Sequence, residues 1–573
     1  LAFVVLSWCS WTALLRSKDF HTLTHSWWRH APIVDHRQPQ VRHYEWNVTR
    51  GELAPDGVYR PLILVNGRFP GPPIQANVGD TLVVKVNNHL SANDSASFSR
   101  WDLAARSRFS SKVDKYYPPG TDERVAIHWH GLSMRGSPEQ DGAPGFTSCA
   151  ILPGSSQKYR FKLQQEDFGT HFWHSHTGMG RSDGLWGALT VHDAVNRSEE
   201  KLLSSYAAAQ GSPPLRWDHE QVVTLGDHYF APGVDQISWF ISRHSLGFEP
   251  TPDNILINGQ GVFDCSRLLD PSKHNCTSKS THPIIKLEQN KTHRLRLINV
   301  GAVGHQTFSI DHHVLTVIEA DGSLIEPYTT TRLSIAPGQR YSVLVETDKA
   351  RSQGNTFWIR SEMDYECLNM PNPNLDYQAK AIVQYVEDQH PQTQPESSER
   401  TVVPPKYDLE LRTKVSKRSF GLRSEQLVLP QTQAWPRKEG EEPCHDEQAK
   451  QLRPLRIAAQ GAPPAPKLDL ASGDKREAIT VTMPKLDRNG LVPVSWINRT
   501  QWTAPSVPLL RSFALAPGTT TANETDLAPS PYDPAHQVVL SPSSADPVTL
   551  ELIINNKDEA PHPFHLHGHK FHV

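Results

Sequence analysis

Three short segments of this chain each hold two histidines that are separated by a single residue. They are IHWHG, with His128 and His130; FWHSH, with His174 and His176; and HPFHLHG, with His562, His565 and His567. Residues i and i+2 of a β-strand point to the same face, so each pair can direct two imidazoles at one metal ion. Imidazole suits copper and zinc in particular. A site shared by all three pairs must lie at an interface, because the first two pairs are more than 380 residues from the third.

A single pair of this kind is weak evidence, because a half-exposed strand can carry two histidines by chance. Three pairs, each beside glycine or aromatic residues, indicate a metal site. A zinc hydrolase is an alternative class, and it needs three ligands, an open position and a nearby carboxylate or thiolate. Six histidines in three paired motifs exceed that requirement, which favours a cluster of metal ions.

Strand patterns dominate the rest of the chain. The apolar face holds Tyr159, Phe161 and Leu163 in QKYRFKL, Leu295 and Leu297 in HRLRLINV, and Val548, Leu550 and Leu552 in VTLELII. Basic or polar residues alternate with these positions, which is typical of strands. Turn sequences such as GRFPGPP and LPGSS occur between them. We therefore expect an all-β fold of antiparallel β-sandwiches.

Two polar stretches, residues 194–217 and 388–406, divide the chain into three β regions. We expect domains at residues 43–193, 218–388 and 401–573. A proline-rich, charged segment at about 430–476 is predicted to be an insertion within the third domain, and another segment at 100–120 interrupts the first domain. The sequence predicts no role for either segment.

The chain begins with an apolar run, LAFVVLSWCSWTALL, which is short for a membrane-spanning helix and typical of a secretory signal. We expect residues 1–20 to be a signal peptide, with a single-pass anchor as the alternative. N-x-S/T sequons agree with an exported or cell-surface protein; they begin at Asn47, Asn93, Asn196, Asn275, Asn290, Asn498 and Asn523. In an oxidising compartment, Cys265 and Cys276 are close enough in sequence to form a disulfide.

The histidine motifs, read as IHWHG, HFWHSHTG and HPFHLHGHKF, resemble the first three copper-binding motifs of the multicopper oxidases. RPLILVNGRFPGPPIQANVGDTLVVKVNNHL, DGLWGALTVHD and DNILINGQGVFDC resemble the ascorbate oxidase and laccase branch, especially its three-domain fungal members. The resemblance covers residues 43–388 and 480–573. It implies three cupredoxin-like Greek-key β-sandwich domains.

The resemblance also implies four copper ions: one type 1 copper in the third domain, and a cluster of one type 2 and two type 3 coppers between the first and third domains. By position in the motifs, His128 and His565 match type 2 ligands, His130, His174, His176 and His567 match type 3 ligands, and His562 matches a type 1 ligand. Asp141, in QDGAPG, matches an acid that the family places near the cluster to assist proton delivery. Its alternative is a plain Asp-Gly turn.

A fourth family motif, H-C-H-x-x-x-H, does not occur in this sequence. In the family its cysteine is the thiolate ligand of the type 1 copper. Cys444, in PCHDEQ, lies upstream of the third motif and does not replace that cysteine. Cys149 matches a family cysteine whose partner lies close to the C-terminus. We therefore expect the chain to be C-terminally incomplete, with a truncated third domain.

The expected function is copper-dependent oxidation of phenols, ascorbate-like enediols or related donors, coupled to four-electron reduction of dioxygen to water. The expected partners are a small-molecule reductant and dioxygen, with membrane contact only through a possible N-terminal anchor. A net charge of −3 without a basic stripe argues against nucleic acid. Two alternatives stay open: a ferroxidase of the same family, and a non-catalytic secreted copper-binding protein that lacks the type 1 site. The sequence predicts neither the natural reductant nor the oligomeric state.

Overall fold

The fold is described from a computed structural model of the chain. The described residues are 38–91, 123–193 and 198–387, with short gaps within 241–247, at 350–353 and at 369, and shorter stretches between 429 and 571. The predicted signal or anchor at 1–20, the segment at 100–120 that interrupts the first domain and the polar stretch at 388–406 lie outside the described residues. None of the helices in the described part has the length and apolar character needed to cross a membrane.

The first motifs belong to a two-sheet unit, here called the first sandwich (β1–β8). One sheet has the order β2-β1-β4-β6 and the other β3-β8-β7-β5. The strands are β1 (Val41–Leu53), β2 (Arg60–Val65), β3 (Ile74–Asn77), β4 (Thr81–Asn88), β5 (Ile127–His130), β6 (Ser156–Lys162), β7 (Gly169–Ser175) and β8 (Trp186–His192). Strand β6 confirms the predicted alternation, because Tyr159 and Phe161 are buried while Arg160 is exposed.

A larger unit, here called the second sandwich (β9–β19), follows in sequence. Its sheets have the orders β10-β9-β12-β17-β14-β15 and β11-β19-β18-β13-β16. The strands are β9 (His219–His228), β10 (Asn254–Ile257), β11 (Ile284–Glu288), β12 (Thr292–Asn299), β13 (Gln306–Ile310), β14 (Leu315–Ala320), β15 (Ser323–Thr330), β16 (Leu333–Ile335), β17 (Arg340–Glu346), β18 (Thr356–Glu362) and β19 (Gln378–Val386). Leu297, Phe308 and Phe357 are fully buried between these sheets.

Buried ion pairs line the contact between the two sandwiches. Glu319 on β14 accepts hydrogen bonds from Arg294 Nη2 at 2.6 Å and Arg296 Nη1 at 3.3 Å. The backbone N–H of Thr170 on β7 donates to the same carboxylate at 2.6 Å. Arg294 Nη1 also donates to Glu199 of helix α5 (Ser198–Ala209) at 2.6 Å. The polar face of HRLRLINV is therefore covered by the first sandwich, and its two arginines are almost completely buried.

The predicted third domain is represented by the terminal sheet, of order β21-β20-β22, and by helix α7 (Leu509–Leu515). Its strands are β20 (Lys475–Thr482), β21 (Trp496–Ile497) and β22 (Leu550–Asn556). Leu550 and Leu552, predicted to share a buried face, are 46% and 38% exposed, and Ile553 on the other face is 42% exposed. Both faces of β22 are thus open among the described residues.

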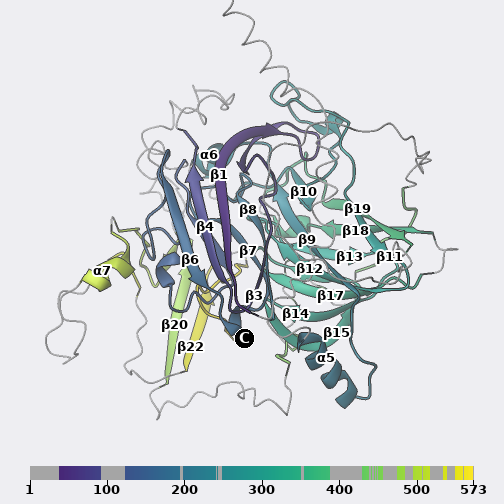
Figure 1. Ribbon diagram of the computed structural model, residues 1–573. Coiled ribbons are helices and arrows are strands. Elements are labelled where there is room, and N and C mark those ends of the chain that lie inside the picture. The colour runs from purple at the N-terminus through teal and green to yellow at the C-terminus, as the bar shows by residue number, and fades with distance from the viewer. Residues whose placement is uncertain are drawn as a thin grey trace, which may run out of the picture.

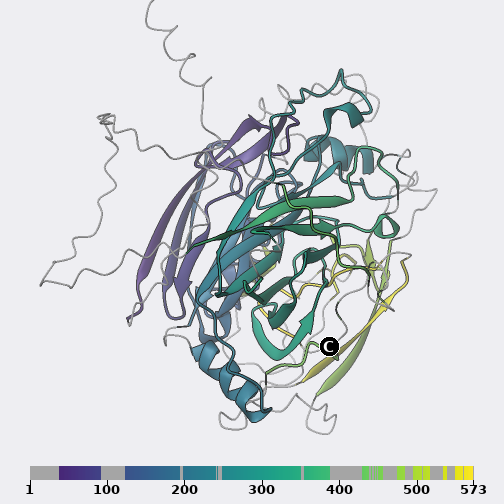
Figure 2. The ribbon, with the colours of Figure 1, turned by 90° about the vertical axis from the view of Figure 1, so that its right-hand side faces the viewer.

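Figure 1 shows the first sandwich in purple and blue beside the second sandwich in teal and green. Figure 2 shows the yellow-green strands of the terminal sheet on the opposite side of the molecule from the purple strands. Helix α5 projects from the lower end of the second sandwich in both views.

The described part of the predicted insertion packs on the second sandwich. The backbone N–H of Glu326 on β15 donates to Arg453 O at 2.8 Å, and Leu455 N–H donates to Leu324 O at 3.0 Å. These bonds add residues 453–455 to the free edge of β15. An exposed strand edge is an aggregation hazard, so this cover protects the sheet.

Two disulfides lie in the described part of the chain. Cys265 bonds to Cys276, which confirms the predicted loop disulfide. Cys367, between β18 and β19, bonds to Cys444 of the predicted insertion. The sequence assigned no partner to Cys444, because these cysteines are 77 positions apart and give no local signal. This second disulfide fastens the insertion to the second sandwich.

Two buried histidines that match no ligand position make stability depend on pH. Burial lowers the pKa of His171 and of His228 well below the usual value of 6.5. Below pH 6.5 the unfolded chain binds protons at these histidines and the folded chain does not, so the free energy of unfolding should decrease as pH falls. We expect a loss of up to about 1.4 kcal/mol per pH unit for each histidine.

Urea unfolding of the metal-free protein at about pH 7.5 and about pH 5.5 measures this dependence. His228→Gln should show a smaller loss of stability between the two pH values than the parent protein. The same loss in parent and variant would contradict the assignment to His228.

Candidate metal centre

The two motifs of the first sandwich lie on neighbouring strands of one sheet. Strands β5 and β7 pair antiparallel, so His128 sits directly opposite His174. His128, His130 and His174 are 1%, 6% and 6% exposed. His176 follows the last residue of β7 and is exposed. This register gathers the two motifs at one end of the sheet.

The terminal motif (residues 562–568) reaches the same place from the far end of the sequence. The His565 ring stacks on His130, with ring centroids 3.8 Å apart, and His565 Nε2 lies 3.2 Å from His128 Nε2. The His567 ring centroid lies 4.0 Å from that of His128 and 5.1 Å from that of His176. Six of the seven predicted histidines therefore form one cluster.

Two overlapping sets of three histidines within this cluster could each hold a metal ion. One set is His128, His130 and His174, and the other is His128, His565 and His567; the ligand nitrogens of each set lie within 4.8 Å of one another. His128 belongs to both sets, so it joins the histidines of the first sandwich to those of the terminal motif. His176 belongs to neither set, although its ring centroid is 5.5 Å from that of His128.

Hydrogen bonds at Nδ1 fix the direction of three of these rings. His174 Nδ1–H donates to Ser175 O at 2.9 Å, and His128 Nδ1–H donates to the backbone oxygen of Asp141 at 3.0 Å. His567 Nδ1–H donates to Asp141 Oδ2 at 2.7 Å. A ring that donates from Nδ1 keeps a lone pair on Nε2, which is the form a metal ion needs.

Asp141 therefore contacts one histidine from each end of the chain. Its Oδ1 is buried and lies 3.1 Å from His128 Nδ1 without forming a hydrogen bond to any described residue. Burial raises the pKa of Asp141, but the close contacts of its carboxylate with His128 and His567 outweigh burial, so the pKa is below the usual value and the carboxyl group is ionised. Gly142 is required beside it, since a Cβ there would lie 1.8 Å from Ile127 O.

Burial also sets the protonation of the histidines. It lowers the pKa of His128, and it lowers the pKa values of His130 and His174 well below the usual value. These imidazoles are therefore neutral at pH 7 and their lone pairs are available to a metal ion.

His562 is the one predicted ligand that lies outside the cluster. Its Nε2–H donates to Asp558 Oδ2 at 2.7 Å, which leaves the lone pair of Nδ1 to bind a metal ion. The resemblance implies a type 1 copper apart from the other three coppers, so a ligand of that copper is expected to lie outside the cluster.

Family models described as multicopper oxidase match residues 47–101 with 119–196, 219–388 and 500–573. The L-ascorbate oxidase of Brassica rapa subsp. pekinensis is 30% identical over 576 aligned positions, which cover 96% of this chain and 83% of that protein. The chain belongs to the multicopper oxidase family. Laccase-1 of Cryptococcus neoformans var. grubii is 31% identical over 62% of this multicopper oxidase and 50% of that laccase. The chain spans about half the length of the first curated relatives that it matches.

Solved structures agree on the fold. Fet3p, described as a multicopper oxidase that functions in iron import, has a TM-score of 0.60 at 22% identity, covering 92% of this chain and 75% of Fet3p. The laccase from Botrytis aclada has a TM-score of 0.57 at 26% identity, covering 82% and 65%. The predicted all-β fold of cupredoxin-like β-sandwich domains is thus confirmed.

Membership of the multicopper oxidase family implies copper cofactors. The histidine cluster fits copper, because imidazole nitrogen suits this metal and His128, His130 and His174 are neutral. The unpaired, buried Oδ1 of Asp141 adds a negative charge beside the nitrogens, which favours a bound cation.

The sequence did not reveal that Asp141 would accept a hydrogen bond from His567, nor that Ser175 would orient His174. The first bond joins residues 426 positions apart. The second uses a backbone oxygen, which any residue type offers. Neither leaves a signal in the pattern of residue types.

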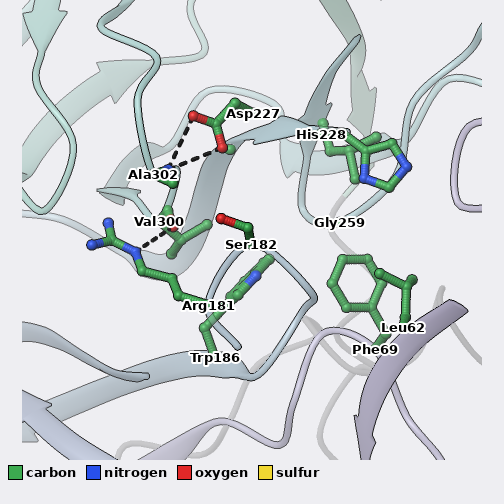
Figure 3. Close-up of a pocket in the computed structure, with 12 residues that line it drawn as sticks. Leu62, Phe69, Arg181, Ser182, Trp186, Asp227, His228, Gly259, Val300 and Ala302 are labelled. Carbon is green, nitrogen blue, oxygen red and sulfur yellow. Dashed lines mark hydrogen bonds between the residues drawn. The ribbon is translucent and has the colours of Figure 1, made fainter. Parts of the chain in front are cut away.

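A small cavity between the two sandwiches lies apart from the histidine cluster (Figure 3). Its volume of about 20 Å³ is enough for a water molecule. Arg181 Nε donates to Val300 O at 2.9 Å on one side, and Asp227 accepts from the backbone N–H of Ala302 at 3.0 Å on the other. None of the seven predicted histidines lines this cavity, so we assign it no part in metal binding.

Proposed function

We propose that the protein is a copper-dependent oxidoreductase that oxidises phenols, ascorbate-like enediols or related donors and reduces dioxygen to water with four electrons. The meeting of six histidines from both ends of the chain, five of them in two overlapping sets, is the observation that carries this proposal. Relatives named laccase and L-ascorbate oxidase support the class of donor.

In this proposal the six clustered histidines bind one type 2 and two type 3 coppers, and His562 binds a type 1 copper. Bound copper supplies one-electron oxidation and reduction steps. Oxygen acceptors hold the Nδ1 hydrogens of His128, His174 and His567, which fixes the direction of these rings and leaves their Nε2 lone pairs available to a metal ion. The sequence contains no H-C-H motif, which in the family supplies the thiolate of the type 1 copper.

We assign two roles to Asp141. It accepts the hydrogen bond from His567, and its carboxylate lies beside the histidine cluster, where it can assist proton delivery. Reduction of dioxygen to two waters consumes four protons, so a carboxylate at this position meets a chemical need.

Replacing Asp141 by asparagine should weaken copper binding by about 10- to 100-fold, the range typical of residues that orient metal ligands. Asparagine keeps the shape of the side chain but removes the negative charge and can present an N–H to His567. Competition with a copper chelator measures the affinity. Glu139→Gln is the matched control, because it removes an exposed carboxylate two residues away. Equal weakening in both variants would contradict the role of Asp141.

Oxygen uptake by the copper-loaded protein tests the proposed function. The donors are a phenol, ascorbate and ferrous iron, each tried alone. We expect uptake with a phenol or with ascorbate, and no uptake in His128→Gln. Uptake with ferrous iron alone would instead support the ferroxidase alternative. If the protein binds copper but takes up no oxygen with any of these donors, the result would contradict the oxidase proposal and support copper binding alone.

We also propose that the protein passes through the secretory pathway. The sequon residues Asn275, Asn290 and Asn498 are exposed, and the last two lie in turns with φ values of 59° and 51°. Two disulfides agree with an oxidising compartment. A decrease in mass after enzymatic removal of N-linked glycans from the native protein is the expected result.

A further inference from the structure

The turn between β14 and β15 touches the first sandwich directly. Asp321 and Gly322 form this two-residue turn with φ values of 49° and 74°, a conformation that an Asp-Gly pair favours. A Cβ on Gly322 would lie 2.7 Å from His171 Cε1, and a Cβ on Gly169 would lie 2.6 Å from the Gly322 Cα. The turn therefore rests against the start of β7 with backbone close to backbone.

Arg340 fixes this turn to the strand that carries His174. Arg340 is the first residue of β17 and is 4% exposed. Its backbone N–H donates to Asp321 Oδ1 at 2.9 Å, and its Nη1 lies 2.9 Å from the same oxygen. Its Nε donates to Thr170 O at 3.0 Å, and Thr170 lies on β7 four residues before His174.

Lys570 connects the terminal motif to the same turn. Its Nζ donates to Gly322 O at 2.7 Å, and it follows His567 by three residues. The turn thus contacts both segments that bring histidines to the cluster: β7 through Arg340, and the terminal motif through Lys570.

We propose that Lys570 is a positioning residue, whose hydrogen bond to Gly322 sets the place where the terminal motif meets β5 and β7. The second sandwich then helps to assemble the histidine cluster through its β14–β15 turn. This inference rests on the proposed function in that the cluster is taken to hold copper.

Charge alone predicts the opposite effect, which makes the proposal testable. The ammonium group of Lys570 repels a copper ion, so removal of that charge should strengthen copper binding if electrostatics were its only influence. Weaker copper binding after removal of Lys570 therefore indicates a loss of position.

Lys570→Met in the full chain tests the proposal, with Lys570→Arg restoring a cationic donor. Lys557→Met, at an exposed lysine just after β22, is the control for loss of charge. Copper affinity is one measurement, and hydrogen exchange of residues 562–571 in the metal-free protein is the other. We expect Lys570→Met to bind copper on the order of tenfold more weakly and to exchange faster in this segment. Lys570→Arg should restore both properties, and Lys557→Met should change neither.

Unchanged exchange in Lys570→Met would overturn the proposal, whether copper binding is unchanged, tighter or weaker, because the lysine would then not hold the segment. If the parent protein binds no copper, the proposed function fails. The exchange comparison in the metal-free protein still decides in that case whether Lys570 positions the terminal motif.

Discussion

His128→Gln should lower the affinity of the protein for copper by more than about 100-fold. Mutating a residue that only orients a ligand costs up to about 100-fold in affinity, and His128 is itself a proposed ligand. The reason is that His128 alone belongs to both sets of converging nitrogens. Its loss leaves two histidines in each set, and it removes the 3.2 Å contact between His128 Nε2 and His565 Nε2. His130→Gln should have a smaller effect, because His130 belongs to one set only.

Competition with a chelator, together with the copper content after dialysis, measures these effects. His43→Gln is the matched control, since His43 is an exposed histidine on β1. We expect it to bind copper like the parent protein. A His128→Gln variant that keeps the parent's copper content would show that the histidine cluster is not the copper site.

Glu319→Ala should destabilise the protein by about 3–5 kcal/mol, the usual effect of removing one partner from a buried ion pair. Arg294 and Arg296 are 0% and 1% exposed, and both hydrogen-bond to this carboxylate. Thr170 would also lose the acceptor for its backbone N–H at 2.6 Å. In the variant, two buried guanidinium groups and one backbone N–H at the contact between the sandwiches each lose a hydrogen-bond acceptor.

Urea unfolding at pH 7 measures the change in the free energy of unfolding. The matched control is Glu346→Ala, which removes an exposed carboxylate at the end of β17 and should change stability by no more than about 0.5 kcal/mol. A Glu319→Ala variant as stable as this control would contradict the role of the buried ion pairs.

Local sequence patterns were sufficient to predict the strands and the histidine pairs. His128 and His130 lie on the four-residue strand β5, where their spacing puts both on one face. The alternation in β6 likewise separates a buried face from an exposed face. Both results follow from the two-residue period of a strand, which is visible in the residues themselves.

Contacts between distant segments could not be predicted in the same way. The alternation in β12 identifies two faces, but it does not tell whether the face with Arg294 and Arg296 meets water or another sheet. The same limit applies to Leu550 and Leu552, whose alternation predicts a buried face that the described residues do not cover. Burial of a face depends on the packing partner, and a local pattern carries no information about that partner.

The predicted insertion gives a second example. Its proline and charge content indicated an insertion within the third domain, and that content does not show where such a segment packs. The disulfide between Cys367 and Cys444 and the bonds to β15 place its described part on the second sandwich. Asp141 is a third case. The resemblance placed it near the metal site, but it did not predict the hydrogen bond from His567 to its carboxylate.

Anomalous diffraction from crystals of the copper-loaded protein, recorded at the copper absorption edge, tests the central claim most directly. We predict peaks among the nitrogens of His128, His130 and His174, and among those of His128, His565 and His567. Copper peaks found only at other places, or no copper peaks in crystals that contain the metal in solution, would contradict the claim that segments from the two ends of this chain form one copper centre.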